Sequence, residues 1–281
     1  MNFRSCTIVS ISFLSVGVLL YFIKELTPLQ VHHFKWETLK KKSQSNERMQ
    51  CHMEGEKHTP RIQAGQFTSG SWISKKFQGE HCRELSATGT TLTTQLQVEE
   101  GGFDTGIWHS TTDNRIDDLH PETTISAQTE IDLFDVEDKS WWMVGPKVSA
   151  MICQNCSLED NLSTWYENYI IENASQSPDQ RHEKCLNSPE KCQYIGQTAQ
   201  NGSTYKHYLW KHNTWKQFYA VRQDYRTGGE VNIAPIMKYW RNNGHPNHYL
   251  NGIKYNFESG NAVSGTVIIK DLKIDNFGIF K

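Results

Sequence analysis

The chain of 281 residues is 37% hydrophobic, 21% charged and 11% aromatic, and its formal net charge is −2. This length accommodates one all-β domain of roughly 200–250 residues with appendages. The small net charge gives no long-range attraction to nucleic acid, and no basic cluster with interleaved aromatic residues occurs, so no nucleic-acid partner is predicted. The aromatic content favours a β protein with a stacking surface over a helical bundle.

An apolar segment near the N-terminus is the clearest targeting signal. It runs from Ile8 to Ile23, between Arg4 and Lys24, and its length of about 16 residues lies between a signal-peptide core and a full membrane span. No small-residue cleavage site follows it, because Leu19-Leu20-Tyr21-Phe22 is bulky. We predict an uncleaved signal anchor in residues 1–25, with residues 8–23 in the membrane, and a cleaved signal peptide is the alternative. The protein is then a type II membrane protein facing the lumen or extracellular space, or it is secreted.

The cysteines favour the same oxidising compartment. Cys6 lies at the membrane edge, and the other six form an even set of disulfide candidates: Cys51, Cys82, Cys153, Cys156, Cys185 and Cys192. Short loops make the pairs Cys153–Cys156 and Cys185–Cys192 plausible, which leaves Cys51–Cys82, but the sequence does not fix the pairing. The alternative is a zinc site in which Cys185 and Cys192 complete the Cys153-x-x-Cys156 motif.

Four acceptor sequences for N-glycosylation cluster within about fifty residues of one another. They are centred on Asn155, Asn161, Asn173 and Asn201. Because several clustered acceptors carry more weight than one, they predict a glycosylated surface in the secretory pathway.

The chain divides by composition into the N-terminal segment, a polar stalk or linker at residues 26–60, and a β domain at residues 61–281. In the β domain, short candidate strands recur between Gly, Asn, Asp and Pro residues. They are Gly70–Phe77, Thr90–Val98, Thr124–Phe134, Met143–Ile152, Trp165–Asn173, Tyr205–Trp210, Lys216–Gln223, Tyr249–Phe257 and Thr266–Ile274. This pattern predicts an all-β sandwich or jelly roll.

One segment has a helical rather than a β period. In the run Glu230–Asn243, apolar residues recur at Val231, Ala234, Met237 and Trp240, which lie on one helical stripe. Pro235 is tolerated early in such a helix. We therefore predict a single helix that covers part of the sheet.

Two predicted strands carry carboxylates, and the first of them holds two, Glu167 and Glu172. In Trp165–Asn173, Glu167 and Tyr169 share a face, and in Tyr249–Phe257 and its extension, Lys254, Asn256 and Glu258 share a face. Two carboxylates that face each other across an aromatic cleft are the equipment for cleavage of a glycosidic bond.

These segments resemble the glycoside hydrolase family 11 xylanases in order and spacing. The resemblance rests on Tyr166–Asn173, on Gly202–Tyr205, on the Val-Arg-Gln-x-x-Arg-Thr-Gly-Gly run from Val221 to Gly229, and on Trp240-x-x-x-Gly244. It covers about residues 160–270 and implies a concanavalin-like β-jelly roll, two sheets with one helix. It also implies a retaining endo-glycosidase that acts on a β-1,4-linked polysaccharide.

Residue by residue, the resemblance implies that Glu167 is the nucleophile, Tyr169 a tyrosine of the cleft and Arg222 an arginine of the cleft floor. The family 11 register places the acid/base at Tyr255, which cannot serve. The related family 12 endoglucanases, which share the jelly roll, have a final motif whose register places it at Glu258, and the match at Tyr249-Leu250-x-Gly252 favours that register.

The chain also departs from family 11. The segment between Tyr205 and Val221 is roughly nine residues shorter than usual and lacks the Pro-Ser-Ile tip of the thumb loop. Lys254, on the face of Glu258, is expected to lower the pKa of a nearby acid. These departures favour an alternative reading, a catalytically inactive glycan-binding or cell-surface recognition protein on the same fold.

Flat aromatic side chains are the candidates for stacking on sugar rings. One or two of Trp72, Trp108, Trp141, Trp142 and Trp165 are expected to line the groove. The histidines are scattered without metal-ligand spacing, so no metal or other cofactor is predicted, and the sequence leaves the oligomeric state open.

Overall fold

The computed structural model describes residues 28–52, 60–109, 115–134, 140–151, 166–212 and 215–277. The chain divides into two compact units, residues 1–46 and 47–281. In the first unit, helix α2 (Pro28–Ser45) occupies much of the predicted stalk, which the polar composition did not reveal as helical. No helix in the described part of the chain is long and apolar enough to cross a membrane. The predicted membrane segment at residues 8–23 lies outside the described residues.

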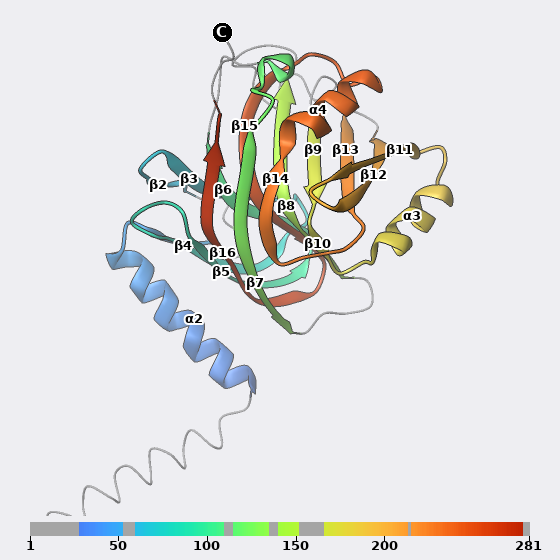
Figure 1. Cartoon of the computed structure of the whole chain (residues 1–281). Coiled ribbons are helices and arrows are strands. Elements are labelled where there is room, and N and C mark those ends of the chain that lie inside the picture. The colour runs from blue at the N-terminus through green and yellow to red at the C-terminus, as the bar shows by residue number, and fades with distance from the viewer. Residues whose placement is uncertain are drawn as a thin grey trace, which may run out of the picture. The chain divides into compact units, whose positions relative to one another are not determined.

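The second unit is built from two β-sheets, which confirms the predicted all-β jelly roll (Figure 1). In its described part, the smaller sheet contains, in spatial order, β1 (Met49–His52), β4 (Gln78–Leu85), β5 (Leu92–Glu100), β16 (Val263–Asp275), β7 (Thr124–Phe134) and β14 (Gly228–Asn232). The larger sheet contains β11 (Cys192–Gln200), β12 (Ser203–Lys211), β13 (Lys216–Arg222), β9 (Tyr166–Ile171), β8 (Trp141–Met151), β15 (Tyr249–Gly260), β6 (Gly102–His109), β3 (Phe67–Ile73) and β2 (Ile62–Ala64), with β10 (Asn173–Ala174) beside β8. Its pairs are antiparallel except β9 with β13, which is parallel.

The hydrophobic core lies between the facing surfaces of the two sheets. Alternating residues of the smaller sheet, such as Leu96 and Val267, share one buried cluster with alternating residues of the larger sheet, such as Ile107 and Phe257. Because strand side chains alternate, the other residues of the larger sheet are directed to its opposite surface, which we call the outer face. The core therefore fixes which side chains reach the outer face.

The predicted helix is α4 (Ile233–Asn242), which starts two to three residues later than its apolar stripe suggested because Val231 belongs to β14. The side chain of Asn232 caps it by accepting a hydrogen bond from the backbone N–H of Ala234. Trp240 is fully buried and packs on Phe218 of β13, with ring centroids 5.8 Å apart. The buried side of the helix packs against the sheet through the hydrophobic core, as predicted.

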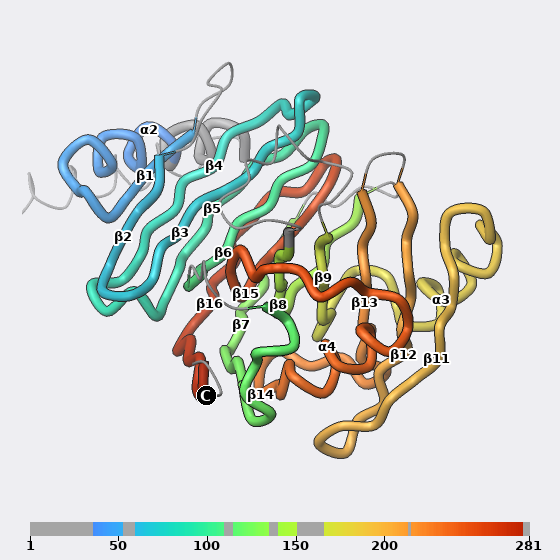
Figure 2. Tube along the Cα trace, turned by 90° about the horizontal axis from the view of Figure 1, so that it is seen from above, coloured from blue at the N-terminus to red at the C-terminus, as the bar shows by residue number. Residues whose placement is uncertain are grey.

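A second helix of this unit, α3 (Pro178–Leu186), was not predicted. Ser177 and Gln180 form a reciprocal capping box at its start. The Cys185–Cys192 disulfide ties its end to the first residue of β11, and the helix lies beside that strand (Figure 2). A short 3-10 helix, η1 (Ile116–Asp118), is the remaining helical element of the described part.

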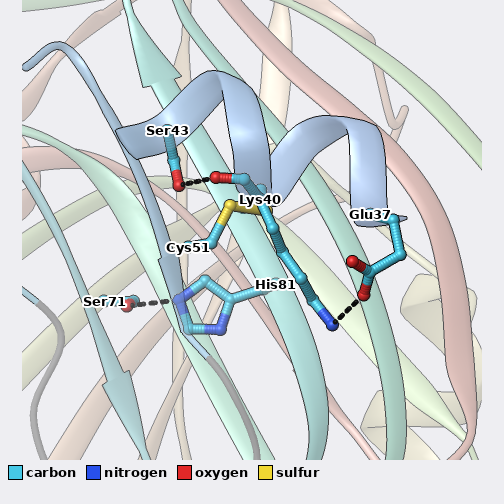
Figure 3. The surroundings of a disulfide bond; sticks show 7 residues. Glu37, Lys40, Ser43, Cys51, Ser71 and His81 are labelled. Carbon is cyan, nitrogen blue, oxygen red and sulfur yellow. Dashed lines mark hydrogen bonds and ion pairs between the residues drawn. A yellow bond between two sulfur atoms is a disulfide. The ribbon is translucent and has the colours of Figure 1, made fainter. Parts of the chain in front are cut away.

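The other disulfide joins β1 to β4, where Cys51 and Cys82 are direct partners in the antiparallel register. Figure 3 shows its surroundings, in which the Ser71 hydroxyl lies 2.9 Å from Nε2 of His81. Both described disulfides are the plausible pairs, and the bond between Cys185 and Cys192 removes the ligands that the zinc alternative needs. Disulfides are typical of secreted and extracellular proteins. Cys153 and Cys156 lie outside the described residues.

Two of the four predicted glycosylation sites fall in the described part. Asn201 is exposed at the turn between β11 and β12, and Asn173 is half-buried in β10. Asn155 and Asn161 lie outside the described residues. Glycosylation stays a prediction at all four positions.

Candidate active site

Strand register brings charged side chains from four adjacent strands together on the outer face. Glu167 and Tyr169 come from β9, Lys147 from β8, Glu258 from β15 and Asp104 from β6. Lys147 is the partner of Tyr169, and Glu258 is the partner of Asp104, so that the paired side chains share a face. Together with Lys254 of β15, we call these residues the Lys147 cluster.

The hydroxyl group of Tyr169 lies between the two carboxylates singled out from the sequence. It is 3.0 Å from Oε2 of Glu167 and 2.6 Å from Oε2 of Glu258. These two oxygens are therefore no further apart than the sum of the two distances, about 5.6 Å. Retaining glycosidases hold their carboxyl groups about 5–5.5 Å apart, whereas inverting enzymes need about 6.5–9.5 Å. The upper bound on the separation of these two oxygens is thus shorter than the spacing that inverting enzymes need.

Lys147 and Asp104 form the buried floor of the cluster. The Lys147 ammonium lies 2.8 Å from Oε1 of Glu167, 2.9 Å from Oδ2 of Asp104 and 3.9 Å from Oε2 of Glu258. Asp104 also accepts hydrogen bonds from Lys254 at 2.6 Å and from Asn256 at 3.3 Å. The Lys147 and Asp104 side chains are 6% and 4% exposed, while those of Glu167 and Glu258 are 16% and 15% exposed. The two glutamates are therefore the carboxylates that solvent or a ligand reaches.

The two glutamates have opposite pKa shifts. Burial raises the pKa of Glu258 to about 7; the charge of Lys147 lowers it, and the negative charges of Asp104 and Glu167 raise it. Burial also acts to raise the pKa of Glu167, but the charge and hydrogen bond of Lys147 outweigh it and lower the pKa below its usual range. Below about pH 7 this environment favours an ionised Glu167 beside a protonated Glu258.

Charge balance explains this division. The cluster has three carboxyl groups but only two ammonium groups, those of Lys147 and Lys254. Salt bridges to both lysines overcome burial and lower the pKa of Asp104 to about 2, so its negative charge is permanent. One proton on Glu258 makes the cluster neutral. Lys254, which was expected to lower the pKa of a nearby acid, pairs with Asp104, and burial makes the pKa of Glu258 rise.

Two side chains of β13 complete the surroundings of Glu167. Gln217 donates a hydrogen bond to Oε2 of Glu167 at 3.0 Å, and its carbonyl oxygen accepts one from the Tyr219 hydroxyl at 2.7 Å. The Tyr219 ring stacks on that of Tyr169, with centroids 5.2 Å apart. Since β9 and β13 pair in register, Gln217 and Tyr219 stand directly beside Glu167 and Tyr169. They hold the polar groups of Glu167 and Tyr169 in fixed orientations.

Arg222 lies away from Glu167, in a second ionic cluster on the core side of β13. It is an even-numbered residue of the strand, whereas Gln217 and Tyr219 are odd-numbered, so alternation directs it to the opposite face. It donates hydrogen bonds to Asp224 at 2.9 Å and to Tyr205 at 3.2 Å, and lies 3.9 Å from Glu172. Glu172 is 1% exposed and also pairs with Arg226. We call Glu172, Tyr205, Arg222, Asp224 and Arg226 the Glu172 cluster.

The tryptophans named from the sequence divide between the two faces. Trp72 is 53% exposed and pairs with Asp104, so it lies on the outer face beside the Lys147 cluster, and Trp108 shares that face. Trp141 borders a pocket on the same face. Trp142 packs toward the core, where its ring stacks on Phe257. Trp165 lies outside the described residues.

Sequence reasoning missed Lys147, Asp104 and Gln217. A signal existed for the first two, because each is a single charged residue inside an otherwise apolar or small-residue run of a strand. A buried charge in such a run needs a partner. The identity of that partner depends on the order of strands in the sheet, which the local pattern does not contain.

Comparison with known proteins gives the fold. No protein-family model matches the chain, and no curated protein sequence matches it. Among solved structures, it is similar to the family 11 xylanase from Neocallimastix patriciarum, with a TM-score of 0.64 and 18% identity, over 80% of this chain and 98% of that chain. It is also similar to a mutant of the ENZbleach xylanase, with a TM-score of 0.57 and 16% identity, over 82% of this chain and 88% of the other. At such low identity the likeness establishes that the chain has the family 11 xylanase fold.

Proposed function

We propose that this protein is a retaining endo-glycosidase that hydrolyses a β-1,4-linked, xylan-like polysaccharide through Glu167 and Glu258. The single observation that carries the proposal is the Tyr169 hydroxyl, which touches an oxygen of each carboxyl group at 3.0 and 2.6 Å. The fold shared with xylanases supports the substrate class. The position of Glu258 supports the family 12 register for the acid/base over the family 11 register, which points to Tyr255.

The hydrogen-bond chemistry of Tyr169 supports the assignment of roles. A phenol has one proton and donates to one acceptor at a time. Two short contacts to two carboxyl groups are satisfied together when Glu258 carries a proton and donates it to Tyr169, while Tyr169 donates to ionised Glu167. The raised pKa of Glu258 and the lowered pKa of Glu167 favour the same arrangement.

In the first step, the Glu167 carboxylate attacks the anomeric carbon and forms a covalent ester. The bond from that carbon to the glycosidic oxygen breaks, and the oxygen takes the proton of Glu258. In the second step, ionised Glu258 takes a proton from water, whose oxygen attacks the anomeric carbon and releases Glu167. The product keeps the configuration of the substrate because the carbon is inverted twice.

Lys147 and Gln217 have positioning and electrostatic roles in this scheme. Lys147 keeps Glu167 ionised, and Gln217 fixes the orientation of its second oxygen. As Glu167 loses its charge in the covalent ester, the Lys147 ammonium remains paired with Asp104, so its charge is still compensated. Asp104 therefore provides a counter-charge for Lys147 both when Glu167 is a free carboxylate and when it is a covalent ester.

The test is the release of reducing sugar from β-1,4-xylan by the full chain. Glu167→Gln is expected to reduce activity on the order of 10⁴-fold or more, because it removes the nucleophile. Glu230→Gln, at an exposed position of β14, is the matched control and should retain wild-type activity. Equal activity of Glu167→Gln and wild type would exclude Glu167 as the nucleophile.

One observation favours a glycan-binding protein without catalysis. The 2.8 Å ion pair between Lys147 and Glu167 reduces the reactivity of the carboxylate toward carbon. In that case, wild type binds xylo-oligosaccharides with no product, and Glu167→Gln leaves their affinity unchanged. Product analysis by mass spectrometry after long incubation separates the two functions.

A further inference from the structure

A pocket of about 170 Å³ opens beside the Lys147 cluster, between α3 and the larger sheet. It shares Gln217 and Tyr219 with the surroundings of Glu167. Its volume is more than ten times the about 10–15 Å³ that a cavity needs to hold one water molecule, which suits a small ring rather than a single ion. The remaining lining residues are Trp141, Met143, Gln176, Arg181, Lys184, Tyr208, Trp210, His212 and Val221.

The pocket has two cations and no carboxylate among its lining residues. Arg181 and Lys184 are three residues apart on α3 and therefore neighbours on one helix face. They act on each other: burial and the charge of Arg181 lower the pKa of Lys184. Two neighbouring positive charges in a recess are an unfavourable arrangement that an anion relieves.

The nearby acidic residues of α3 do not compensate these charges. Asp179 lies 3.8 Å from Lys206 of β12, and Glu183 is exposed. The guanidinium of Arg181 hydrogen-bonds Tyr225, but its buried Nε atom has no hydrogen-bond partner among the described residues. Within the described residues neither Arg181 nor Lys184 forms an ion pair with a carboxylate, and an anion in the pocket would supply one.

Aromatic surfaces stand next to the cations. Trp141 and Trp210 line the pocket, are both half-buried, and are the aromatic side chains on which a sugar ring can stack, whereas Tyr208 is buried in the pocket wall. The hydroxyl of Tyr208 is held by His182 of α3, 3.1 Å away. The combination of stacking faces with two positive charges suits a charged sugar better than a neutral sugar or a free ion.

We propose that this pocket is a subsite for a sugar unit with an anionic group, so that the substrate is an acidic β-1,4-linked polysaccharide. This inference rests on the proposed function, because it adds a substrate class to the same site. The shared chemistry is a carboxylate or sulfate on the sugar, which Arg181 and Lys184 bind while the ring stacks on the aromatic residues. A neutral polysaccharide would leave both cations without a counter-charge.

The experiment measures kcat/KM of the full chain on three forms of one polymer: glucuronoxylan, the same glucuronoxylan with its carboxyl groups reduced to alcohols, and the reduced polymer after sulfation. Wild type is expected to prefer at least one anionic form over the reduced form by about tenfold. The two anionic polymers show which anionic group the pocket binds. Preference for glucuronoxylan identifies a carboxylate, and preference for the sulfated polymer identifies a sulfate.

The variant is Arg181→Gln combined with Lys184→Gln, and the single Lys184→Gln serves if the double variant unfolds. The ratio of kcat/KM between the anionic and reduced polymers is expected to fall by roughly tenfold in the double variant and by roughly threefold in the single one. The matched control is Lys238→Gln, at an exposed position of α4, which should leave the ratio unchanged. An unchanged ratio in the folded double variant, or no preference in wild type, would overturn the subsite.

These measurements can reject the anionic subsite without rejecting the proposed glycosidase function. If wild type hydrolyses all three polymers equally, the glycosidase stands and the subsite falls. If wild type hydrolyses none, the same comparison is made by calorimetric binding of the three polymers. Preferential binding of an anionic form that the double variant loses supports the subsite, and equal affinities overturn it.

Discussion

Two ionic clusters lie on opposite faces of the larger sheet, and they differ in their balance of charge. The Glu172 cluster combines two carboxylates with two arginines, so every charge has a counter-charge. The Lys147 cluster combines three carboxyl groups with two lysines. Such a surplus leaves one carboxyl group that is more stable with a proton, and the raised pKa of Glu258 identifies it.

The two clusters also differ in access. Glu172 is 1% exposed, whereas Glu167 and Glu258 are 16% and 15% exposed on the outer face. Glu167 and Glu172 belong to one short segment of chain, five positions apart, yet strand alternation places them on different faces. One segment of chain therefore supplies Glu172 to the balanced cluster on the core side and Glu167 to the unbalanced, more exposed cluster on the outer face.

After the loss of Glu167, the largest effect on activity is expected from removal of the proton carried by Glu258. Glu258→Gln should lower kcat/KM on xylan by roughly 10²–10⁴-fold, because a positioned general acid contributes about that much. On an aryl glycoside with a good leaving group, which needs little protonation, the loss should be less than about tenfold. Steady-state kinetics on both substrates check this, and equal losses on the two would contradict the acid role.

A second effect concerns the free energy of unfolding, which should decrease when the Glu172 cluster is disrupted. Glu172→Gln removes one member of a buried ion pair and leaves Arg226 without its counter-charge. We expect a loss of about 3 kcal/mol in the free energy of unfolding, with the activity of the folded fraction retained. Urea unfolding monitored by tryptophan fluorescence gives the value. If the Glu172→Gln variant were as stable as wild type but inactive, Glu172 would have a role in activity rather than in stability, contrary to this prediction.

A third effect is the dependence of stability on pH. The folded pKa of Glu258, about 7, lies above the value near 4.5 of an unperturbed glutamate, so between these pH values the folded state binds more protons than the unfolded state. This group therefore makes stability fall as pH rises from about 4.5 to about 7.

Glu258→Gln removes that contribution. Relative to wild type, the variant should gain stability between pH 4 and pH 8, by up to roughly 3 kcal/mol. Denaturant unfolding of both proteins at four pH values measures the gain. Parallel pH profiles would show that Glu258 has the same pKa folded and unfolded.

Local patterns were sufficient to predict much of the fold and the faces of two strands. The two-residue period places Glu167 with Tyr169, and Glu258 with Lys254, because alternation is a property of a strand alone. The same period argues against Arg222 as a neighbour of Glu167, since Gln217 is the residue of β13 that pairs with Glu167. The face that Arg222 occupies relative to Glu167 could be deduced only once the structure had shown how β9 and β13 pair.

The rest depended on long-range order. Lys147 and Asp104 meet Glu167 only because β8 and β15 lie between β9 and β6 in the sheet, an order that differs from chain order. Helix α3 was missed because its run is mostly polar and short, and its end is held by the Cys185–Cys192 disulfide rather than by a long apolar stripe. Helix α2 was missed because a polar helix has no hydrophobic period to detect.

The most direct measurement is a carbon-13 NMR titration of the glutamate side-chain carboxyl groups, with Glu258→Gln and Glu167→Gln used to assign the signals. We expect one glutamate of wild type to titrate with an apparent pKa of about 7, with its signal absent from Glu258→Gln, and a second glutamate to stay ionised below the usual range. In Glu167→Gln the pKa of Glu258 should fall, because a neighbouring negative charge is gone. Two glutamates that both titrate near 4.5 would contradict the division of roles on which the proposed hydrolysis depends.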